Sequence, residues 1–398
     1  MQPSHHRRTI PRARIWDAPV RMFHWLFVLA FAGAWLSTGD AYLHIHVFAG
    51  YGFGGLLLFR LAWGLVGGGH ARFTRFAYGP AQAWHYLRSL PGRRAAHYNG
   101  HNPAGAWAVF AMLALAAGVT ATGLLTLAGQ EQAGPLAGWL GFAAGDRFHG
   151  VHETLAWALT AVVGLHLLGV VVSSLAHREN LAGGMVTGRK RTVGEADVPA
   201  RIGVAAMVIG AIGLGALIYF RSALTAPAGT PYRPYQGPQL ARNTTWSEEC
   251  GACHLAYHPN LLPARSWRRL LDSQHDHFGE DLALDRATLR ALAAFATANA
   301  ADHQATEAAW NIVHTIPPSA APMRITDTVY WRRKHAALGT AVWSQANVHG
   351  RSDCAACHRD AGPGTFRDGA MRVPAASPPG RHAAANPPSP PLAKETGS

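Results

Sequence analysis

Cysteine is scarce in this chain of 398 residues, which has only four, and all four fall in two copies of one short pattern. The copies are Cys250-Gly-Ala-Cys253-His254 and Cys354-Ala-Ala-Cys357-His358. Because no cysteine remains outside them, the sequence excludes a structural disulfide framework and a spare thiol. Charge is also scarce, since 14% of the residues are charged while 49% are hydrophobic. That balance is too apolar for an ordinary soluble protein and predicts membrane segments.

The pattern C-x-x-C-H is the spacing that attaches haem c. The two thiols bond to the porphyrin, and the histidine that follows supplies one axial ligand to the iron. Two alternatives use the same residues. A redox dithiol of this spacing occurs in a thioredoxin-like βαβ fold, and the sequence shows no such pattern. A zinc site would have to join pairs that lie about 100 residues apart and that each carry their own histidine. We therefore expect two covalent haems c.

The chain has a net charge of +13, and much of its basic charge flanks apolar runs. This distribution favours a membrane protein and argues against a nucleic-acid partner. The basic start leads into an apolar stretch without an obvious small-residue cleavage site, so we interpret that stretch as an uncleaved first membrane helix. Long strand-like alternation is missing from the soluble part at 240–372, and together with the apolar helices this predicts a mainly α fold.

Five apolar runs are each close to the ~20 residues that cross ~30 Å of hydrocarbon as a helix. They span about 22–38, 46–66, 104–128, 150–175 and 202–220. The segments 1–21, 67–103 and 176–201 are rich in arginine, whereas 39–45 has no basic residue and 129–149 has one. Basic loops stay in the cytoplasm. The sequence therefore predicts a multi-pass protein of the bacterial inner membrane, with a cytoplasmic N-terminus and a periplasmic C-terminal part, where haem c is attached.

The composition divides the chain into five parts. One amphipathic helix is clear in the soluble part, with Asp285 as its N-cap and Leu289, Leu292 and Phe295 on one face. The expected parts are a membrane domain of four helices at 1–201, a fifth membrane helix at 202–223, a proline-rich linker at 224–240, a small, mostly α, periplasmic dihaem domain at 241–373 and a disordered tail at 374–398.

Histidines inside membrane helices are costly and usually functional. His152 and His166 are 14 residues apart, so they share one helix face and are separated by ~21 Å along its axis. Helix direction then places His46 at the outer depth of His152 and His24 at the inner depth of His166. We therefore expect an outer haem b between His46 and His152 and an inner haem b between His24 and His166. The alternative is that these histidines are packing or interfacial residues.

Two arginines near the depths of these histidines can each be interpreted in two ways. Arg60 follows His46 by 14 residues and could pair with a haem propionate or extend to the headgroups. Arg21, one turn before His24, has the same two readings. His44 and His149 lie at the expected water boundary, where we interpret them as interfacial.

The membrane part resembles the bacterial cytochrome b561 family, in the branch shared with the cytochrome b subunit of nickel hydrogenases. The resemblance implies a four-helix bundle that holds two b haems, with His24, His46, His152 and His166 at the ligand positions. The fifth helix departs from the four-helix pattern, and we interpret it as a tether. The residues that carry the resemblance are Trp16-Asp17 with Arg21, His24 and Trp25; His46-Val-Phe-Ala-Gly50-Tyr51; Phe59-Arg60-Leu-Ala-Trp63-Gly64; Gly100-His-Asn102-Pro103; His152-Glu153; Arg178-Glu-Asn180; and Thr187-Gly-Arg189-Lys190.

Residues 246–365 resemble the dihaem cytochrome c family. That resemblance implies bis-histidine haems with His277 and His335 as distal ligands, and it leaves open which haem each serves. The residues alone leave more candidates: His258, His275, His303, His314, His349, Met323 and Met371. The resemblance rests on Trp246-x-x-Glu249-Cys250, Leu262-Pro263, Trp267, His277-Phe-Gly-Glu280, Arg324-Ile-Thr326 and the second C-x-x-C-H copy.

These features predict a membrane electron-transfer cytochrome without catalytic side chains of its own. Electrons would come from membrane quinol or a partner dehydrogenase and leave through the haems c to a soluble periplasmic redox protein. A second class remains open, an enzyme that oxidises quinol or reduces superoxide or oxygen at a five-coordinate haem; for quinol oxidation, His149 and Glu153 lie at a suitable depth. A third reading is a membrane anchor for a hydrogenase or another dehydrogenase.

Overall fold

The computed structural model describes residues 12–39, 42–90, 96–192, 195–225, 237 and 239–374. The chain divides into two compact units, 1–238 and 239–398. Five helices in the first unit are long and apolar enough to cross a membrane. Of the predicted linker, residues 226–236 and 238 lie outside the described residues, as do residues 375–398 of the predicted tail.

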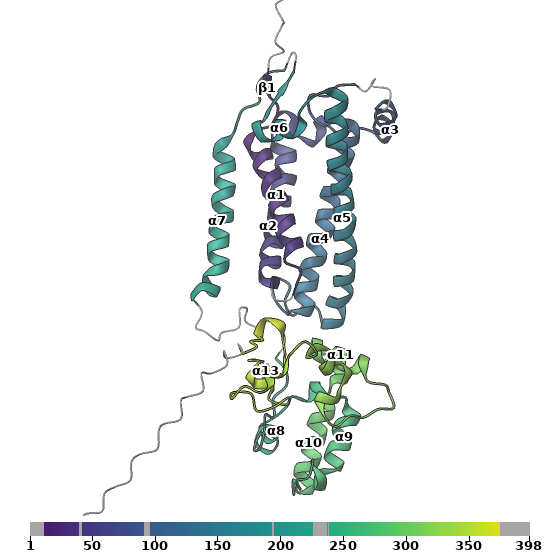
Figure 1. The fold of residues 1–398 in the computed structure, drawn as a ribbon, viewed down its shortest axis with the longest axis vertical. Helices are drawn as coiled ribbons and strands as arrows, with labels where there is room; N and C mark the ends of the chain where they lie inside the picture. The colour runs from purple at the N-terminus through teal and green to yellow at the C-terminus, as the bar shows by residue number, and fades with distance from the viewer. Residues whose placement is uncertain are drawn as a thin grey trace, which may run out of the picture. The chain divides into compact units, whose positions relative to one another are not determined.

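The first unit is built from seven helices and a two-stranded ribbon among its described residues. Helix α4 packs along α5, and α1 packs along α2, while α7 contacts α1 and α2. Figure 1 shows these helices standing side by side, with α7 at the edge of the bundle. The elements are β1 (Arg12–Arg14), α1 (Ala18–Leu36), α2 (Leu43–Val66), α3 (Pro80–Ser89), α4 (Pro103–Gln130), α5 (Phe142–His177), α6 (Leu181–Thr187), β2 (Arg189–Arg191) and α7 (Ile202–Thr225).

Local sequence explains where these helices begin. The Asp17 side chain accepts from Val20 N and caps α1, and the Asn102 side chain accepts from Gly105 N and caps α4. A proline follows each cap within two residues, where its missing N–H leaves no hydrogen bond unmade. Helices α1 and α4 therefore start at capping signals rather than at the first residue of an apolar run.

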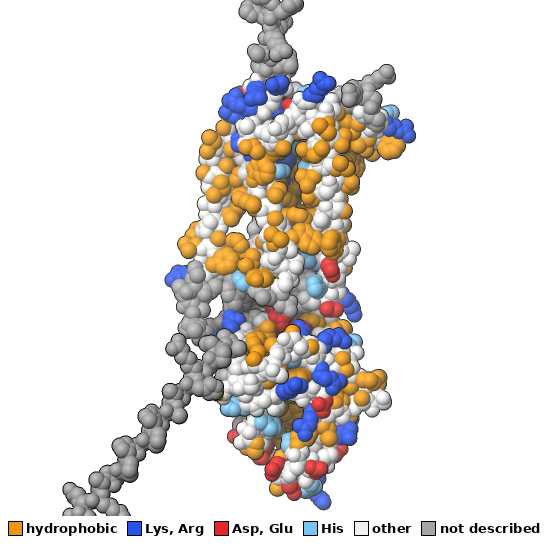
Figure 2. Space-filling model, in the orientation of Figure 1, with side chains coloured by type: hydrophobic (Ala, Val, Ile, Leu, Met, Phe, Trp, Pro, Cys, Tyr) orange, Lys and Arg blue, Asp and Glu red, His pale blue; other side chains and the backbone are white. Residues whose placement is uncertain are grey.

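The centre of the bundle is aromatic and aliphatic. A buried cluster joins α1, α2, α4, α5 and α7, and the rings of Phe27 and Phe53 stack there at 4.0 Å. Many large apolar side chains on the outside of the helices stay exposed, and Figure 2 shows them as orange patches over the bundle. A helix that is apolar outside as well as inside belongs in lipid rather than in water. The buried members of the cluster are Met22, Phe23, Phe53, Leu56, Leu57, Leu113, Ala116, Leu159 and Ala205.

The ribbon gathers basic residues at one end of the bundle. Strand β1 pairs antiparallel with β2, with Arg12 opposite Arg191 and Arg14 opposite Arg189. The loop before α4 reaches the same end, because Lys190 Nζ donates to the Tyr98 carbonyl. Figure 2 shows Lys and Arg side chains in blue at this end. Parts of the three basic segments identified in the sequence thus lie together in space.

The second unit consists of short helices joined by turns. Two buried clusters form its core, one around Trp246, Trp267 and Leu292 and one around Leu261, Ala309 and Ile312. The Asp285 side chain accepts from Ala287 N and Thr288 N, so the predicted N-cap is confirmed. The helices are α8 (Thr244–Glu249), α9 (Ala264–Asp272), α10 (Arg286–Ala298), α11 (Glu307–Thr315), α12 (Val329–Lys334) and α13 (Thr340–Trp343).

The predicted fold class is confirmed: the described residues are mainly helical, with five candidate membrane helices followed by a small α unit. One boundary differs clearly. Helix α5 begins at Phe142, eight residues before the expected 150, because the helix continues through the polar residues Asp146, Arg147 and His149. An apolar run shows the stretch that can lie in lipid, whereas the helix itself extends beyond it.

Candidate haem sites

His46 and His152, the outer pair, come together between α2 and α5. Their ring centroids lie 6.1 Å apart with an interplanar angle of 73°. A metal–imidazole bond is about 2 Å long. Two such bonds on opposite sides of one iron, together with the radius of each ring, give a separation close to the observed one. The outer pair therefore has the spacing that a bis-imidazole haem requires.

Both rings of the outer pair are held through their Nδ1 atoms. His46 Nδ1 lies 2.9 Å from the Ala34 carbonyl oxygen, and His152 Nδ1 lies 2.9 Å from that of Val119. A carbonyl only accepts, so each Nδ1–H donates and each Nε2 keeps the lone pair that binds iron. Gly123 makes room for the His152 ring, since a Cβ there would lie 3.0 Å from His152 Cε1.

His24 and His166, the inner pair, lie on α1 and α5, near enough for their charges to interact. The Nδ1 atom of His24 is buried and has no hydrogen-bond partner among the described residues. The pairing of His24 with His166 on one haem stays a prediction.

Arg60 lies buried, with 4% of its surface exposed. Its guanidinium lies over the Phe73 ring, 4.5 Å from the centroid, and its Nη1 has no hydrogen-bond partner among the described residues. Asp17 is close enough to interact with it electrostatically. This position excludes the reading in which Arg60 extends to the headgroups, and it leaves one N–H group for an anionic ligand such as a propionate.

Arg21 has a protein partner instead. Its Nη2 donates to the Val186 carbonyl in α6, although its Nε is buried without a partner among the described residues. Arg21 therefore connects α1 to the segment before β2, and its Nε remains the group that a propionate could use.

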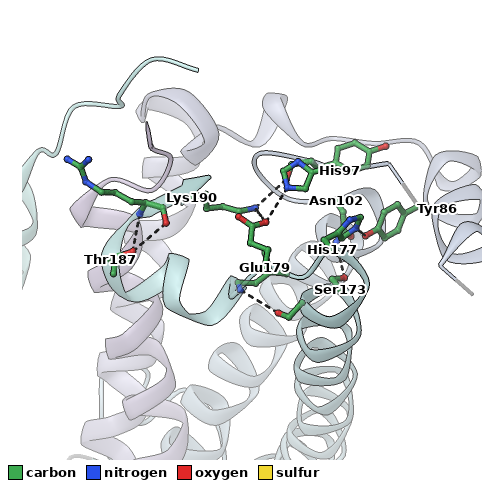
Figure 3. A network of polar contacts seen from close by, with 12 residues as sticks. Tyr86, His97, Asn102, Ser173, His177, Glu179, Thr187 and Lys190 are labelled. Carbon is green, nitrogen blue, oxygen red and sulfur yellow. Dashed lines mark hydrogen bonds and ion pairs between the residues drawn. The ribbon is translucent and has the colours of Figure 1, made fainter. Parts of the chain in front are cut away.

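A polar network covers the cytoplasmic ends of α4 and α5 as the sequence predicts them (Figure 3). Lys190 Nζ lies 3.3 Å from Glu179 Oε2, and His97 Nε2 lies 3.2 Å from the same oxygen. The Lys190 side chain is 4% exposed and that of Glu179 is 13% exposed. The Tyr86 hydroxyl meets His177 Nε2 at 3.5 Å in the same region. Buried charges of this kind need their partners.

The first c site combines Cys250, Cys253 and His254 with His277. The rings of His254 and His277 lie 6.2 Å apart at 25°. His277 stands beside a two-residue turn, in which Phe278 and Gly279 both have positive φ and His277 N donates to the Glu280 carbonyl at 2.7 Å. Burial lowers the pKa of His277, which keeps the ring neutral for a metal.

The second c site combines Cys354, Cys357 and His358 with His335. The rings of His335 and His358 lie 6.2 Å apart at 63°. His335 stacks on Trp331 at 4.3 Å, and its Nδ1 donates to the Trp331 carbonyl at 2.8 Å, so its Nε2 is left for iron. Burial lowers the pKa of both histidines. The structure thus places His277 by the first C-x-x-C-H copy and His335 by the second.

The competing distal candidates are occupied or lie elsewhere. His258 is buried and uses both ring nitrogens, donating to the Ala241 carbonyl and accepting from Asn260 N. His275 pairs with Asp281 at the surface. Met323 packs against the core of the unit. His303, His314 and His349 are exposed. Met371 forms a backbone bridge with His358.

The two alternative uses of the cysteines fit the structure poorly. Burial raises the pKa of Cys250 and of Cys354 to about 11, whereas a redox dithiol needs a lowered thiol pKa. Within the described ranges, no three His, Cys, Asp or Glu side chains gather as a metal ion would require. Two cysteines and one histidine in each motif, facing a second histidine, fit covalent haem.

Sequence reasoning missed several residues at these sites. His101 is buried between Trp16 and Phe76, and burial, followed by the charge of Arg60, lowers its pKa to about 3. Glu179 and Lys190 stood in the quoted motifs without a role. The sequence does contain a signal for two of them. His101 stands next to the helix-capping residue Asn102, and Glu179 is an acidic residue in a segment rich in arginine. Their partners, however, lie up to 92 residues away and no local pattern shows them.

Comparison with known proteins identifies two regions. The family described as Prokaryotic cytochrome b561 matches residues 15–188, and the family described as Dihaem cytochrome c matches residues 246–366. The Probable Ni/Fe-hydrogenase B-type cytochrome subunit of Azotobacter vinelandii is 30% identical over 211 residues, which cover 44% of this chain and 86% of that protein. Its counterpart from Azotobacter chroococcum mcd 1 is 29% identical over the same shares.

Two solved structures match the C-terminal region. The diheme cytochrome c from Rhodobacter sphaeroides is 35% identical, with a TM-score of 0.29, and covers 32% of this chain and 100% of its own. The diheme cytochrome type c from Shewanella baltica OS155 is 28% identical, with a TM-score of 0.27, and covers 35% of this chain and 95% of its own. The chain is thus a multi-pass membrane cytochrome of the prokaryotic b561 family, continued by a region that matches the dihaem cytochrome c family.

Proposed function

We propose that this membrane electron-transfer protein holds four haems and carries electrons between a donor at the membrane and a soluble periplasmic acceptor. The outer pair and the inner pair would each hold one haem b. The first and second c sites would each hold one covalent haem c. Arg60 and Arg21 are the proposed partners of the haem b propionates.

The observation that carries this proposal is the repeated spacing of histidine rings. Three pairs on unrelated parts of the chain have centroid separations of 6.1, 6.2 and 6.2 Å. A separation of this size is the one that two imidazoles on opposite sides of one iron would require.

The ligand type favours electron transfer over catalysis. When bound, each haem supplies a one-electron couple of its iron. Two imidazoles at each site would hold the iron and would leave no position for substrate. The protein fixes ring orientation through carbonyls such as Ala34 O and Val119 O, and it surrounds the outer and inner pairs with apolar side chains. Axial ligand, hydrogen bonding and burial are the factors that tune a haem potential.

We infer the orientation from the basic end of the first unit. The ribbon of β1 and β2 carries arginines at both paired ends, and the loop before α4 joins it there. Basic segments beside membrane helices stay in the cytoplasm. The opposite end, where α7 finishes, would then face the periplasm and deliver the second unit to the compartment where haem c is attached.

Membrane quinol and a partner dehydrogenase are the two proposed donors. The Azotobacter relatives are named as cytochrome subunits of a Ni/Fe-hydrogenase, which favours a partner dehydrogenase. Purification from native membranes distinguishes the two. A large catalytic subunit that stays with the chain supports the dehydrogenase, whereas reduction of the purified chain by quinol alone supports quinol.

Carbon monoxide tests electron transfer against catalysis. Carbon monoxide binds ferrous iron only where an axial position is open. We expect the reduced full-length protein to give the same absorption bands with and without carbon monoxide. A shifted Soret band from one of the haems would contradict bis-histidine ligation at that site and favour the enzyme alternative, with superoxide or oxygen as substrate.

A further inference from the structure

Tyr257 lies between the two C-x-x-C-H motifs of the second unit. Its ring packs nearly parallel to that of His254, with centroids 5.1 Å apart and an interplanar angle of 29°. His254 is the histidine of the first motif. The tyrosine ring therefore covers the proximal ligand of the first c site and limits how that imidazole can rotate.

The hydroxyl of the same side chain reaches the second motif. Tyr257 Oη donates to the Ser352 carbonyl at 2.6 Å, and Ser352 precedes Cys354 by two residues. The phenol therefore donates to the segment that leads into the second c site.

The backbone of Tyr257 is held as well. Trp246 Nε1 donates to the Tyr257 carbonyl at 3.1 Å, and Trp246 belongs to the buried core. The Tyr257 ring also packs against both hydrophobic clusters of the unit, the one around Trp246 and the one around Ile312. A single side chain thus touches a ligand of one site, the approach to the other, and both halves of the core.

We propose that Tyr257 is a positioning residue that joins the two covalent haem sites and sets how readily an electron passes between them. The inference rests on the proposed function, because it requires both c sites to hold haem. The haems, once bound, would supply the one-electron couples, and Tyr257 itself would take no part in the redox change. The ring fixes the His254 imidazole, and the hydroxyl fixes the loop before Cys354.

Two variants of the full-length haem-loaded protein separate the ring contact with His254 from the hydrogen bond to Ser352. Tyr257→Phe keeps the ring and removes the hydrogen bond to Ser352. Tyr257→Leu removes both. Electron paramagnetic resonance of the oxidised protein reports ligand orientation at each site, and a redox titration followed by the same signals reports each potential. The Cys354→Ala/Cys357→Ala variant assigns the signals, because it lacks the second c site.

We expect Tyr257→Phe to shift the second-site signal and potential and to leave the first-site signal as in the wild type. Tyr257→Leu should shift both. Exchange between the sites, followed after flash reduction of a fraction of the protein, should slow several-fold in both variants. The matched control is Tyr330→Phe, which also removes one buried phenol hydrogen bond, to Glu307 at 3.1 Å, and should leave the signals, potentials and exchange unchanged.

The inference is wrong if Tyr257→Leu keeps the wild-type first-site signal, or if Tyr330→Phe changes the two sites as Tyr257→Phe does. If the proposed function itself were wrong, the wild-type protein would lack two covalent haems or two bis-histidine signals. Covalent haem content, measured for every variant on the denatured chain, separates a lost haem from a moved ligand.

Discussion

Backbone carbonyls orient four of the eight histidines that we propose as haem ligands. The Nδ1 atoms of His46 and His152 donate to carbonyls of neighbouring helices, that of His335 donates to the carbonyl of Trp331, and His254 Nδ1 lies 2.8 Å from the Leu255 carbonyl. This arrangement selects one tautomer and directs Nε2 toward the opposing ring. A side chain fixed in this way needs little rearrangement when its iron changes charge, which suits one-electron transfer.

His152→Leu tests the outer pair. Removing one of two axial imidazoles should release the non-covalent outer haem, whereas the thioether bonds keep both haems c on the chain. The measurement is the absorption spectrum and haem content of the purified variant. His149→Leu is the matched control, since His149 is exposed and lies one turn away on the same helix. Loss of haem from His149→Leu, or retention of the full haem content in His152→Leu, would contradict the assignment.

His258 gives a prediction about pH. Burial lowers its pKa below the ordinary 6.5, so below that pH the unfolded chain binds a proton that the folded chain does not. The second unit should therefore lose stability as the pH falls from about 7 to about 5, where histidine charges. His258→Gln should weaken this dependence without abolishing it, because His277, His335 and His358 have lowered pKa values too.

The measurement is the urea midpoint at which the low-spin c-type spectrum disappears, at both pH values. His303→Gln is the control, since His303 is exposed. If His258→Gln and His303→Gln gave the same pH dependence as the wild type, burial of a neutral His258 would not contribute to stability.

At the scale of elements, the 14-residue spacing within α5 and the direction of each span predicted that His46 would lie near His152, and the two rings do lie 6.1 Å apart. Their role as haem ligands stays a prediction. Reasoning from the sequence located the spans but missed the start of α5, because Asp146 and Arg147 interrupt the apolar run. It also missed α3, whose helix lies in a segment read only as a basic loop.

The second unit was less predictable because its contacts are long-range. His277 sits at a two-residue turn between short helices, and nothing periodic links it to His254, 23 residues earlier. The family resemblance supplied His277 and His335, but only folding shows which motif each one faces. The same holds for Tyr257, whose partner Ser352 is 95 residues away.

Lys190 lies in β2, and Glu179 follows the last residue of α5 by two positions. Their ion pair therefore links β2 to the end of that helix. Lys190→Met removes one charge and leaves Glu179 buried, with His97 as its remaining partner. Breaking a buried pair on one side costs about 3–5 kcal/mol. We expect the thermal midpoint of the purified membrane protein to fall clearly. A midpoint equal to that of the wild type would show that the pair does not hold this end of the bundle.

Arg189→Met is the control for that variant. Arg189 lies next in sequence, and its ion pair with Asp197 spans 3.7 Å between side chains that are 45% and 50% exposed. An exposed pair contributes at most about 1 kcal/mol. The midpoint should therefore change little.

At the scale of the whole molecule, an apolar bundle and a small helical unit share one recurring device. In each, histidine rings face one another, and such pairs occur both in candidate membrane helices and in the unit that follows them. With haems at these pairs, as proposed, the chain would connect carriers in lipid with carriers in water. Its direction of flow depends on the haem potentials and on the partners at each end.

The most direct test of this account is a pyridine haemochrome assay of the purified full-length chain, combined with iron analysis. The account predicts b-type and c-type haem in equal amounts, two of each per chain, with the c-type half remaining on the denatured polypeptide. A single haem type, or fewer than four irons per chain, would contradict it.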